Sequence, residues 1–344
     1  MAAPTINRML TRLKALLRRS DLLLIGLTLL VSGLLMARYG APVSSAVVAE
    51  QEAVPEPVEE EGESLSVAKA GAAVRFLMYN AHNYHVSGDV ARARHERKIK
   101  PIAQRNAVAE SIAQVKPEIV GLIEMGGPAA LDDLAERLEK LGLSYPHRKV
   151  LTRYGQNIAL ALLSRHPFAQ DHSKADCPLV GQTNKMMLRG ILDVTVSLAD
   201  QRKFRIMGVH LKSRVDDNPA AALAQRSREA RTLAAHVQHA MRQQPEMPIL
   251  VFGDWNDGPG AQALSAVTQA PSRELALKRL NPKDEHGESW TFFYKAGNEY
   301  STLDQIYVNS VLSRRMGSKS KMGIVSELPQ KVASDHRAVW CDLH

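Results

Sequence analysis

The stretch "PILVFGDWND" (residues 248–257) sets the pattern for most of this 344-residue chain. A short, β-rich apolar run ends at Asp254, and Trp255, Asn256 and Asp257 follow it. Such runs, bounded by glycine and turn residues, are typical of buried strands. A buried strand has no packing use for polar groups at its end, so the stretch predicts a strand that delivers them to a functional site. We expect Trp255 to lie in the core. Asp257 begins an Asp-Gly-Pro sequence, and we expect it to stabilise a turn rather than to act in catalysis.

Seven further apolar runs have the same character and predict strands. They span residues 74–80, 118–124, 157–164, 190–198, 204–210, 303–309 and 337–343. Apolar residues at helical spacing separate several of them, around residues 108–115, 131–141 and 233–241. The mixture of hairpin-like neighbours and helical crossovers indicates an α/β fold with mixed sheets, and not a purely parallel barrel.

Polar side chains recur where these strands end or begin. They are Asn80, Glu124, His210, Asp254, Asp304, Asp335 and His336. If the last two strands run antiparallel to the earlier ones, all of these groups reach one edge of the sheets. Hard divalent cations such as Mg²⁺ prefer oxygen ligands, and a protein often supplies only one or two carboxylates. An imidazole near a phosphate can donate to it or take a proton, and a carboxylate behind it fixes its tautomer. The pattern therefore indicates metal-assisted phosphoester chemistry.

The net charge of +8 is unevenly distributed. Residues 1–40 carry six Lys and Arg against Asp21, whereas residues 41–66 carry seven glutamates and no Lys or Arg. Residues 67–344 carry 38 basic against 28 acidic side chains, which suits an anionic substrate. A chain of this length needs no disulfide scaffold, and its two cysteines show no metal-ligand spacing. Whether they pair is left open.

The N-terminal region predicts membrane targeting. Basic residues 1–20 precede "LLLIGLTLLVSGLLMA" (22–37), whose length lies between a signal-peptide core and a full membrane span. We expect a single-pass signal anchor over 21–38 with the basic segment in the cytoplasm, a cleaved signal and a buried core helix being the alternatives. Residues 39–70 predict an acidic, Pro- and Glu-rich linker, and residues 71–344 a catalytic domain. That domain would lie on the extracytoplasmic side of the inner membrane, or be secreted if the segment is cleaved.

Six motifs, in this order, resemble the endonuclease/exonuclease/phosphatase superfamily of metal-dependent phosphoesterases, which includes type I deoxyribonucleases and exonuclease III-like enzymes. The motifs are "LMYNAHN" (77–83), "IVGLIEMGG" (119–127), "MGVHLKSR" (207–214), "VFGDWND" (251–257), "STLDQIYVN" (301–309) and "SDHRAVW" (334–340). The resemblance implies a four-layer α/β/β/α sandwich with two mixed β-sheets. It also implies a Mg²⁺ cofactor, with Mn²⁺ or Ca²⁺ as alternative ions.

The resemblance assigns site residues in this sequence. The metal ligands would be Glu124, Asn80 and Asp335. The catalytic residues would be His336, Asp254, Asn256, His210 and Asp304. In this assignment Asp254 holds or activates the attacking water, Asn256 contacts the scissile phosphate, and Asp304 orients the acid/base His336. Lys212, Ser213 and Arg189 are candidate substrate-binding residues, with an exposed edge or a structural role as the alternative.

Two further segments bear on the substrate. The basic run "ARARHERKIK" (91–100) predicts either a solvated helix entry or contacts to a polynucleotide backbone. In "ESWTFFYK" (288–295) strand alternation would bury some aromatic rings and leave one at the site to stack on a base.

One departure from the family limits the expected function. The segment "GQTNKMMLRG" (181–190) lacks the tyrosine of the abasic-site enzymes, whereas "HLKS" (210–213) is closer to secreted bacterial nucleases. We therefore expect a membrane-anchored, metal-dependent phosphodiesterase acting on nucleic acid. The alternatives are a phospholipid or small-molecule phosphoesterase of the same fold, and a catalytically inactive binding module. The oligomeric state is left open.

Overall fold

The computed structural model describes residues 71–87, 99–318, 320–326 and 333–344. The basic segment, the signal anchor and the acidic linker expected over residues 1–70 lie outside these ranges, as do residues 91–98 of the basic run. Within the described ranges, no helix combines the length and the apolar character that a bilayer crossing requires.

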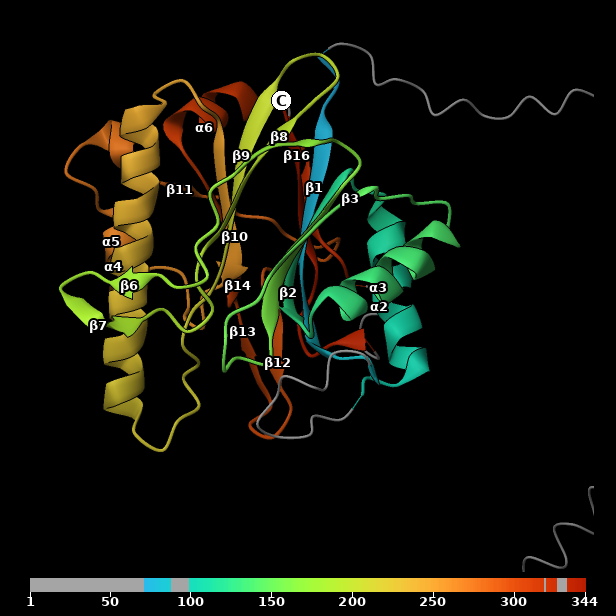
Figure 1. The fold of residues 1–344 in the computed structure, drawn as a ribbon, viewed down its shortest axis with the longest axis horizontal. Helices are drawn as coiled ribbons and strands as arrows, with labels where there is room; N and C mark the ends of the chain where they lie inside the picture. The colour runs from blue at the N-terminus through green and yellow to red at the C-terminus, as the bar shows by residue number, and fades with distance from the viewer. Residues whose placement is uncertain (1–70, 88–98, 319, 327–332) are drawn as a thin grey trace, which may run out of the picture. The chain divides into compact units, whose positions relative to one another are not determined.

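Two six-stranded sheets form the centre of the described region (Figure 1). The first sheet has the strand order β15 (Met322–Ile324), β16 (Val339–Leu343), β1 (Val74–Tyr84), β2 (Ile119–Met125), β4 (Ala159–Ser164) and β3 (His147–Leu151). The second has the order β11 (Lys278–Arg279), β14 (Asp304–Val308), β10 (Ile249–Asp254), β9 (Lys203–His210), β8 (Leu192–Ser197) and β5 (Phe168–Asp171). In each sheet a central pair is parallel, β1 with β2 and β9 with β10, and the other pairs are antiparallel. The prediction of an α/β fold with two mixed sheets is confirmed.

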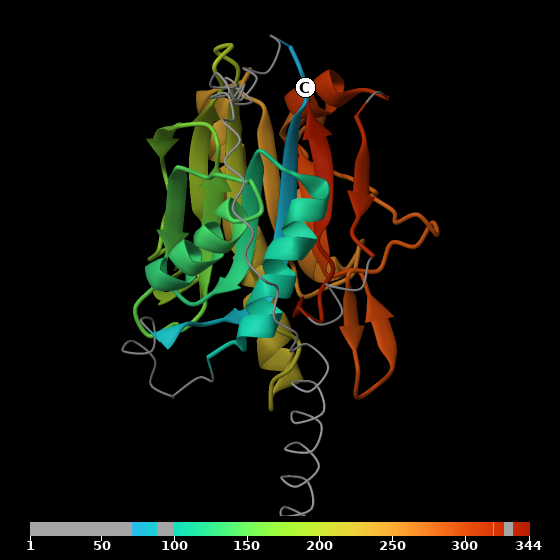
Figure 2. The same ribbon diagram turned by 90° about the vertical axis from the view of Figure 1, so that its right-hand side faces the viewer.

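Helices cover the outer faces of both sheets. Helices α2 (Ile102–Val115) and α3 (Pro128–Glu139) lie against the first sheet, and the long helix α4 (Pro219–Gln243) lies against the second (Figures 1 and 2). Smaller elements complete the described chain. They are the paired strands β6 (Pro178–Leu179) and β7 (Gln182–Met186), the hairpin β12 (Phe292–Tyr294) and β13 (Glu299–Ser301), the helices α5 (Ser265–Thr268) and α6 (Ser310–Met316), and the 3₁₀ turns η2 (Gln262–Leu264) and η3 (Arg273–Leu275).

Strand alternation divides the apolar residues among three cores. In β1, Phe76 and Met78 point between the sheets, whereas Leu77 and Tyr79 point toward α2 and α3. The ring of Phe252 fills the space between the sheets so closely that a Cβ atom on Gly121 or on Gly208 would lie 2.6 Å from it. These two glycines therefore allow the sheets to approach each other around one aromatic ring, because any side chain there would clash with it.

The same alternation carries polar groups to one end of the inter-sheet core. Residues 250 and 252 of β10 point between the sheets, and Asp254 continues this series at the end of the strand. In the sheet register Asp254 pairs with His210 of the parallel strand β9 and with Asp304 of the antiparallel strand β14. Three polar side chains from distant parts of the sequence therefore stand side by side on the face that elsewhere is apolar.

Some local predictions need correction. The helix expected over residues 131–141 ends at Glu139, so Leu141 lies beyond it and is 47% exposed.

The cysteines Cys177 and Cys341 are both free and buried, and they belong to different cores. The short edge strands were not predicted from the sequence, because they carry many polar residues and lack a continuous apolar run.

Candidate active site

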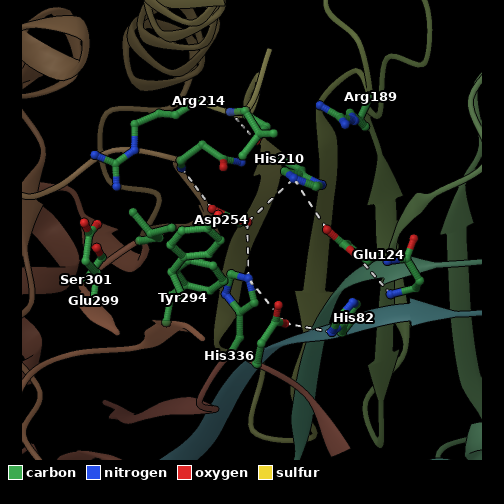
Figure 3. A pocket seen from close by; sticks show the side chains of 17 residues that line it. His82, Glu124, Arg189, His210, Arg214, Asp254, Tyr294, Glu299, Ser301 and His336 are labelled. Carbon is green, nitrogen blue, oxygen red and sulfur yellow. Dashed lines mark hydrogen bonds and ion pairs between the residues drawn. The ribbon is translucent and has the colours of Figure 1, made fainter. Parts of the chain in front are cut away.

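A cavity of about 320 Å³ opens at the polar end of the inter-sheet core (Figure 3). Strands of both sheets, the hairpin β12–β13 and the loop after β9 contribute to its walls. The lining residues are His82, Asn83, Glu124, Arg189, His210, Ser213, Arg214, Val215, Asp254, Asn256, Phe292, Tyr294, Glu299, Ser301, Leu303, Asp335 and His336. Most of the residues that the sequence singled out therefore border one space.

The buried carboxylate of Asp254 is the point where these groups meet. Its Oδ2 atom accepts a hydrogen bond from the Nδ2 atom of Asn80 at 3.1 Å. The same oxygen lies 3.6 Å from Nε2 of His210 and 3.9 Å from Nε2 of His336. Burial raises the pKa of Asp254 to about 7, with the charges of Asp304 and Glu124 acting in the same direction and that of His336 opposing them. A carboxylate in this state is suited to accept a proton.

His336 forms a hydrogen-bonded pair with Asp304. The Nδ1 atom of His336 lies 2.7 Å from Oδ2 of Asp304, and both side chains are buried. Burial opposes the charged imidazole, but the carboxylate of Asp304 outweighs it and raises the pKa of His336 to about 10. The pair thus holds a protonated imidazole whose Nε2 atom is turned toward Asp254. A general acid, or a hydrogen-bond donor to a phosphate group, requires this state.

His210 is the second imidazole in the cavity and differs from His336 in its surroundings. Burial, followed by the nearby positive charges of Arg189 and His336, lowers its pKa well below the usual value. Its Nε2 atom lies 4.0 Å from Oε1 of Glu124. His210 is therefore held as a neutral imidazole that bridges the space between two carboxylates.

Glu124 stands at a strained position at the end of β2. Its φ angle is +62°, in the left-handed region, and the register between β1 and β2 shifts just beside it. The backbone N–H of Asn83 donates to Glu124 Oε2 at 2.9 Å, which helps to fix the carboxylate. Strain of this kind persists where the surrounding structure holds it, often at functional sites. The result is a carboxylate that faces the cavity rather than the core.

The donor atoms present fit a hard divalent cation. Glu124, His210 and Asp254 offer one ligand atom each, all lying within 4.8 Å of one another. A second cluster, formed by Asp254, Asp304 and His336, meets the same criterion, but its imidazole and Asp304 are already joined by a hydrogen bond. Two carboxylates beside an open cavity match the ligand preference of Mg²⁺ or Mn²⁺. The cluster around Glu124 is thus the group best placed to hold a metal.

The other two expected metal ligands have defined partners. The Oδ1 atom of Asn80 accepts the backbone N–H of His82 at 3.1 Å, so its amide nitrogen faces Asp254. Asp335 lies 2.9 Å from Nδ1 of His82 and 4.0 Å from Nε2 of His336. Burial acts to raise the pKa of Asp335, but the hydrogen bond from His82 together with the charges of His336 and His82 lowers it. Both residues border the metal-binding groups, and their role as ligands stays a prediction.

Asn256 is fixed by the turn after β10. Its φ angle is +50°, its backbone N–H donates to Asp254 Oδ1 at 2.9 Å, and its side-chain amide donates to the carbonyl oxygen of Leu211 at 3.0 Å. The neighbouring Trp255 is fully buried and its indole N–H donates to the carbonyl oxygen of Gln305, which confirms its expected place in the core. The turn thus locks the loop after β10 against the loop after β9.

The three candidate substrate-binding residues differ in whether they line the cavity. Arg189 and Ser213 line the cavity. Lys212 does not, because its ammonium group pairs with Asp216 at 2.8 Å. The neighbouring Arg214, which sequence reasoning passed over, lines the cavity instead. Strand alternation stops at the end of β9, so the period of the strand gave no signal for which side chain of the loop points inward.

Other lining residues were also missed. His82 was quoted in the motif "LMYNAHN" without a role, although its imidazole holds Asp335. Tyr294, Glu299 and Ser301 come from the hairpin β12–β13 and form the wall opposite Glu124 (Figure 3). Only the aromatic run in this hairpin gave a signal, since one of its rings was expected at the site.

Comparison with solved structures finds the same fold at low sequence identity. The catalytic domain of human Nocturnin with bound sulfate superimposes with a TM-score of 0.55 and 18% identity, covering 79% of this chain and 94% of that one. Truncated TDP2 of Caenorhabditis elegans gives 0.53 and 17%, covering 79% and 97%. TDP2 of D. rerio, complexed with a single-strand DNA product, gives 0.51 and 16%, covering 79% and 99%. These similarities establish the fold alone.

Comparison with curated protein sequences finds no match. The family model described as the Endonuclease/Exonuclease/phosphatase family matches residues 82–327, which is well over half of the chain. The matched region contains Glu124, His210 and Asp254 of the cavity and Asp304, the partner of His336, and it extends over both sheets. The chain therefore belongs to the endonuclease/exonuclease/phosphatase family.

Proposed function

We propose that this protein is a divalent-metal-dependent phosphodiesterase that hydrolyses nucleic acid. The observation that carries the proposal is the position of Asp254. One buried carboxylate oxygen lies within 3.1 Å of an amide of Asn80, 3.6 Å of His210 and 3.9 Å of His336, at the floor of an open cavity. A structural carboxylate in an apolar core would not be surrounded by two imidazoles and left facing a cavity.

The side chains of the cavity divide the chemical work. Arg189 and Arg214 supply positive charge for a phosphate group, and Asp254 takes the proton of the attacking water. The water oxygen forms a bond to phosphorus as the bond to the leaving sugar oxygen breaks, and His336, oriented by Asp304, donates to the phosphate and gives its proton to that leaving oxygen. A divalent ion held at Glu124 would neutralise part of the negative charge on the phosphate. Asp254 ends β10 of the second sheet and His336 precedes β16 of the first, so the packing of the two sheets sets the distance between these proton-carrying groups.

The charge of the chain supports nucleic acid as the substrate. Residues 67–344 carry an excess of ten basic side chains, which favours a polyanion. A structural neighbour, TDP2 of D. rerio, is complexed with a single-strand DNA product, and the fold that it shares with this chain supports a nucleic-acid substrate here. A phospholipid or a small phosphoester is the alternative substrate, and an inactive binding module is the remaining possibility.

We further propose that the catalytic domain acts outside the cytoplasm, held by a signal anchor at residues 21–38. The support is the sequence alone, namely the basic segment followed by an uncharged apolar run. Protease accessibility of the C-terminus in spheroplasts tests this location. Protection of the C-terminus until the membrane is lysed would contradict it.

The function is tested with the purified full-length chain in detergent, on circular DNA, linear DNA, RNA and sphingomyelin, with EDTA, Mg²⁺ or Mn²⁺. We expect metal-dependent cleavage of nucleic acid that Asp254→Asn and His336→Gln remove while the circular dichroism spectrum is unchanged. Lys149→Gln, at a salt bridge whose two residues do not line the cavity, is a control that keeps activity. Cleavage of sphingomyelin alone would favour the lipid alternative, and no cleavage with any metal would favour a binding module.

A further inference from the structure

The hairpin β12–β13 separates the catalytic cavity from a second, larger cavity. Strand alternation turns Phe292 and Tyr294 into the catalytic cavity. The residues between and beside them, Phe293 and Lys295, face the other way and line a space of about 970 Å³, as does Tyr300 of the partner strand. The hairpin therefore presents aromatic rings on both of its faces.

Three aromatic rings form one wall of the second cavity. The rings of Phe293 and Tyr300 are stacked, with centroids 4.7 Å apart and an angle of 27° between their planes. Trp290 meets the edge of Tyr300 at 4.8 Å, and the guanidinium of Arg337 lies 4.1 Å over the Trp290 ring. Tyr300 is nevertheless 57% exposed. Trp290 and Phe293 thus hold Tyr300 in place without covering it, as a stacking platform requires.

The remaining wall of the second cavity is basic. Lys100 borders it with its ammonium group donating to the carbonyl oxygen of His82 at 3.0 Å, and Lys295 adds a second cation, whereas the buried guanidinium of Arg337 is paired with Asp284. Asp335 is the one acidic side chain among the described lining residues, and it pairs with His82. A site that combines exposed aromatic area with excess positive charge suits an aromatic group attached to a phosphate backbone.

The two cavities adjoin at the residues next to His336. His82, Asn83 and Asp335 line both of them. The hairpin is also hydrogen-bonded to the segment that carries His336, because the N–H of Phe293 donates to the carbonyl oxygen of Asp335 at 3.0 Å. A molecule with its phosphate in the first cavity can therefore extend past Asp335 into the second without crossing the hairpin.

We propose that the second cavity binds a nucleobase next to the scissile phosphate, by stacking on Tyr300. This inference rests on the proposed nuclease function and adds a requirement for an unpaired base at that position. The hairpin connection favours a base over a lipid chain. Its residues 295–298 read Lys-Ala-Gly-Asn, which gives no large apolar side chain for insertion into a bilayer.

The test compares oligonucleotides that differ by one base. Each is single-stranded with a single phosphodiester, the other linkages being slowly cleaved phosphorothioates. One carries normal nucleotides, and two carry an abasic sugar on the 5′ or on the 3′ side of the phosphodiester. We expect the wild-type chain to cleave one abasic substrate with a kcat/KM about tenfold lower than the normal one, since base stacking has that magnitude. Tyr300→Ala should reduce this preference to less than about twofold, whereas Tyr300→Phe should keep it.

Tyr154→Ala is the matched control, because Tyr154 is 98% exposed and lines neither cavity. It should retain both the rate and the preference of the wild type. Equal cleavage of all three oligonucleotides by the wild type would overturn the subsite alone. A Tyr300→Ala variant that loses rate on all three by the same factor would do so too, because it would indicate a structural role. If no oligonucleotide is cleaved while sphingomyelin is, both the subsite and the nuclease function are overturned.

Discussion

The Nδ1 atom of His336 and the Oδ2 atom of Asp304 are 2.7 Å apart, although 32 residues separate them in the chain. Antiparallel pairing of β14 with β10 places Asp304 opposite Asp254. These two carboxylates therefore lie on either side of the His336 imidazole. Asp304 acts on His336 as a positioning residue, holding the ring and its proton.

Removing this carboxylate should impair catalysis more than binding. For Asp304→Asn we expect kcat to fall roughly 100- to 10,000-fold, the range for the loss of a positioned acid or base, with KM nearly unchanged. Steady-state kinetics on one DNA substrate measures this. Asp132→Asn is the control, since its side chain pairs with Arg148 at an exposed site. A variant with a normal kcat and a raised KM would show that Asp304 serves substrate binding instead.

Metal binding should stabilise the folded chain through Glu124. A ligand that binds only the folded state at one hundred times its Kd adds about 2.7 kcal/mol to the free energy of unfolding. We expect Mg²⁺ or Mn²⁺ to raise the Tm of the wild type relative to EDTA and to have little effect on Glu124→Gln. Thermal unfolding followed by circular dichroism provides the measurement. The exposed Glu136→Gln on α3 should respond like the wild type, and an unchanged shift in Glu124→Gln would remove Glu124 from the metal site.

Glu229 should position two loops of the cavity from outside it. This buried residue of α4 accepts the backbone N–H of Leu188 at 3.0 Å and that of Lys212 at 2.7 Å. The next residues along each loop, Arg189 and Ser213, line the cavity. Glu229→Ala should lower the free energy of unfolding by about 1–3 kcal/mol for each N–H left unpaired. It should also raise KM more than it lowers kcat, because the loops carry substrate contacts.

Chemical denaturation and steady-state kinetics of the same preparation test both effects of Glu229→Ala. Arg231→Gln, an exposed change on the same helix, is the control and should leave both quantities unchanged. A loss of stability with an unaltered KM would limit Glu229 to a structural role.

A buried charge cluster away from the cavity should make stability depend on acid pH. Asp193 of β8 accepts two hydrogen bonds from Arg205 at 2.8 and 2.6 Å and lies 2.7 Å from Nε2 of His236 on α4. Burial opposes its ionisation, but the bonds from Arg205 and His236 outweigh burial and lower the pKa of Asp193. The folded pKa is thus below the unfolded one, so this stabilisation is present above the unfolded pKa and is lost as the pH falls through the folded value.

For Asp193→Asn we expect the free energy of unfolding at neutral pH to fall by about 3–5 kcal/mol, because Arg205 is left as a buried charge without its partner. The difference from the wild type should shrink below the ordinary aspartate pKa. Urea unfolding at neutral and acidic pH measures both. A difference that stays constant across this range would show that the charge of Asp193 does not carry the effect.

The sequence was sufficient to predict the main strands and the polar residues at their ends. Short, continuous apolar runs reveal a buried strand, and a carboxylate at the end of such a run, as at Asp254 and Glu124, has no packing explanation. The six motifs then pointed to the family that the match over residues 82–327 establishes. Edge strands such as β5 were missed, because they are short, carry many polar residues and lack a continuous apolar run.

Only the tertiary structure decided which of these groups meet. Asn80 and His336 are 256 positions apart, and they become neighbours because β16 pairs with β1 while the two sheets pack around Phe252. Loop side chains were equally undetermined, since Lys212 turns to Asp216 and Arg214 to the cavity without any periodic signal. Local patterns in a chain specify which way each strand faces, but the contacts across sheets depend on strand order and register, which arise from packing of the whole domain.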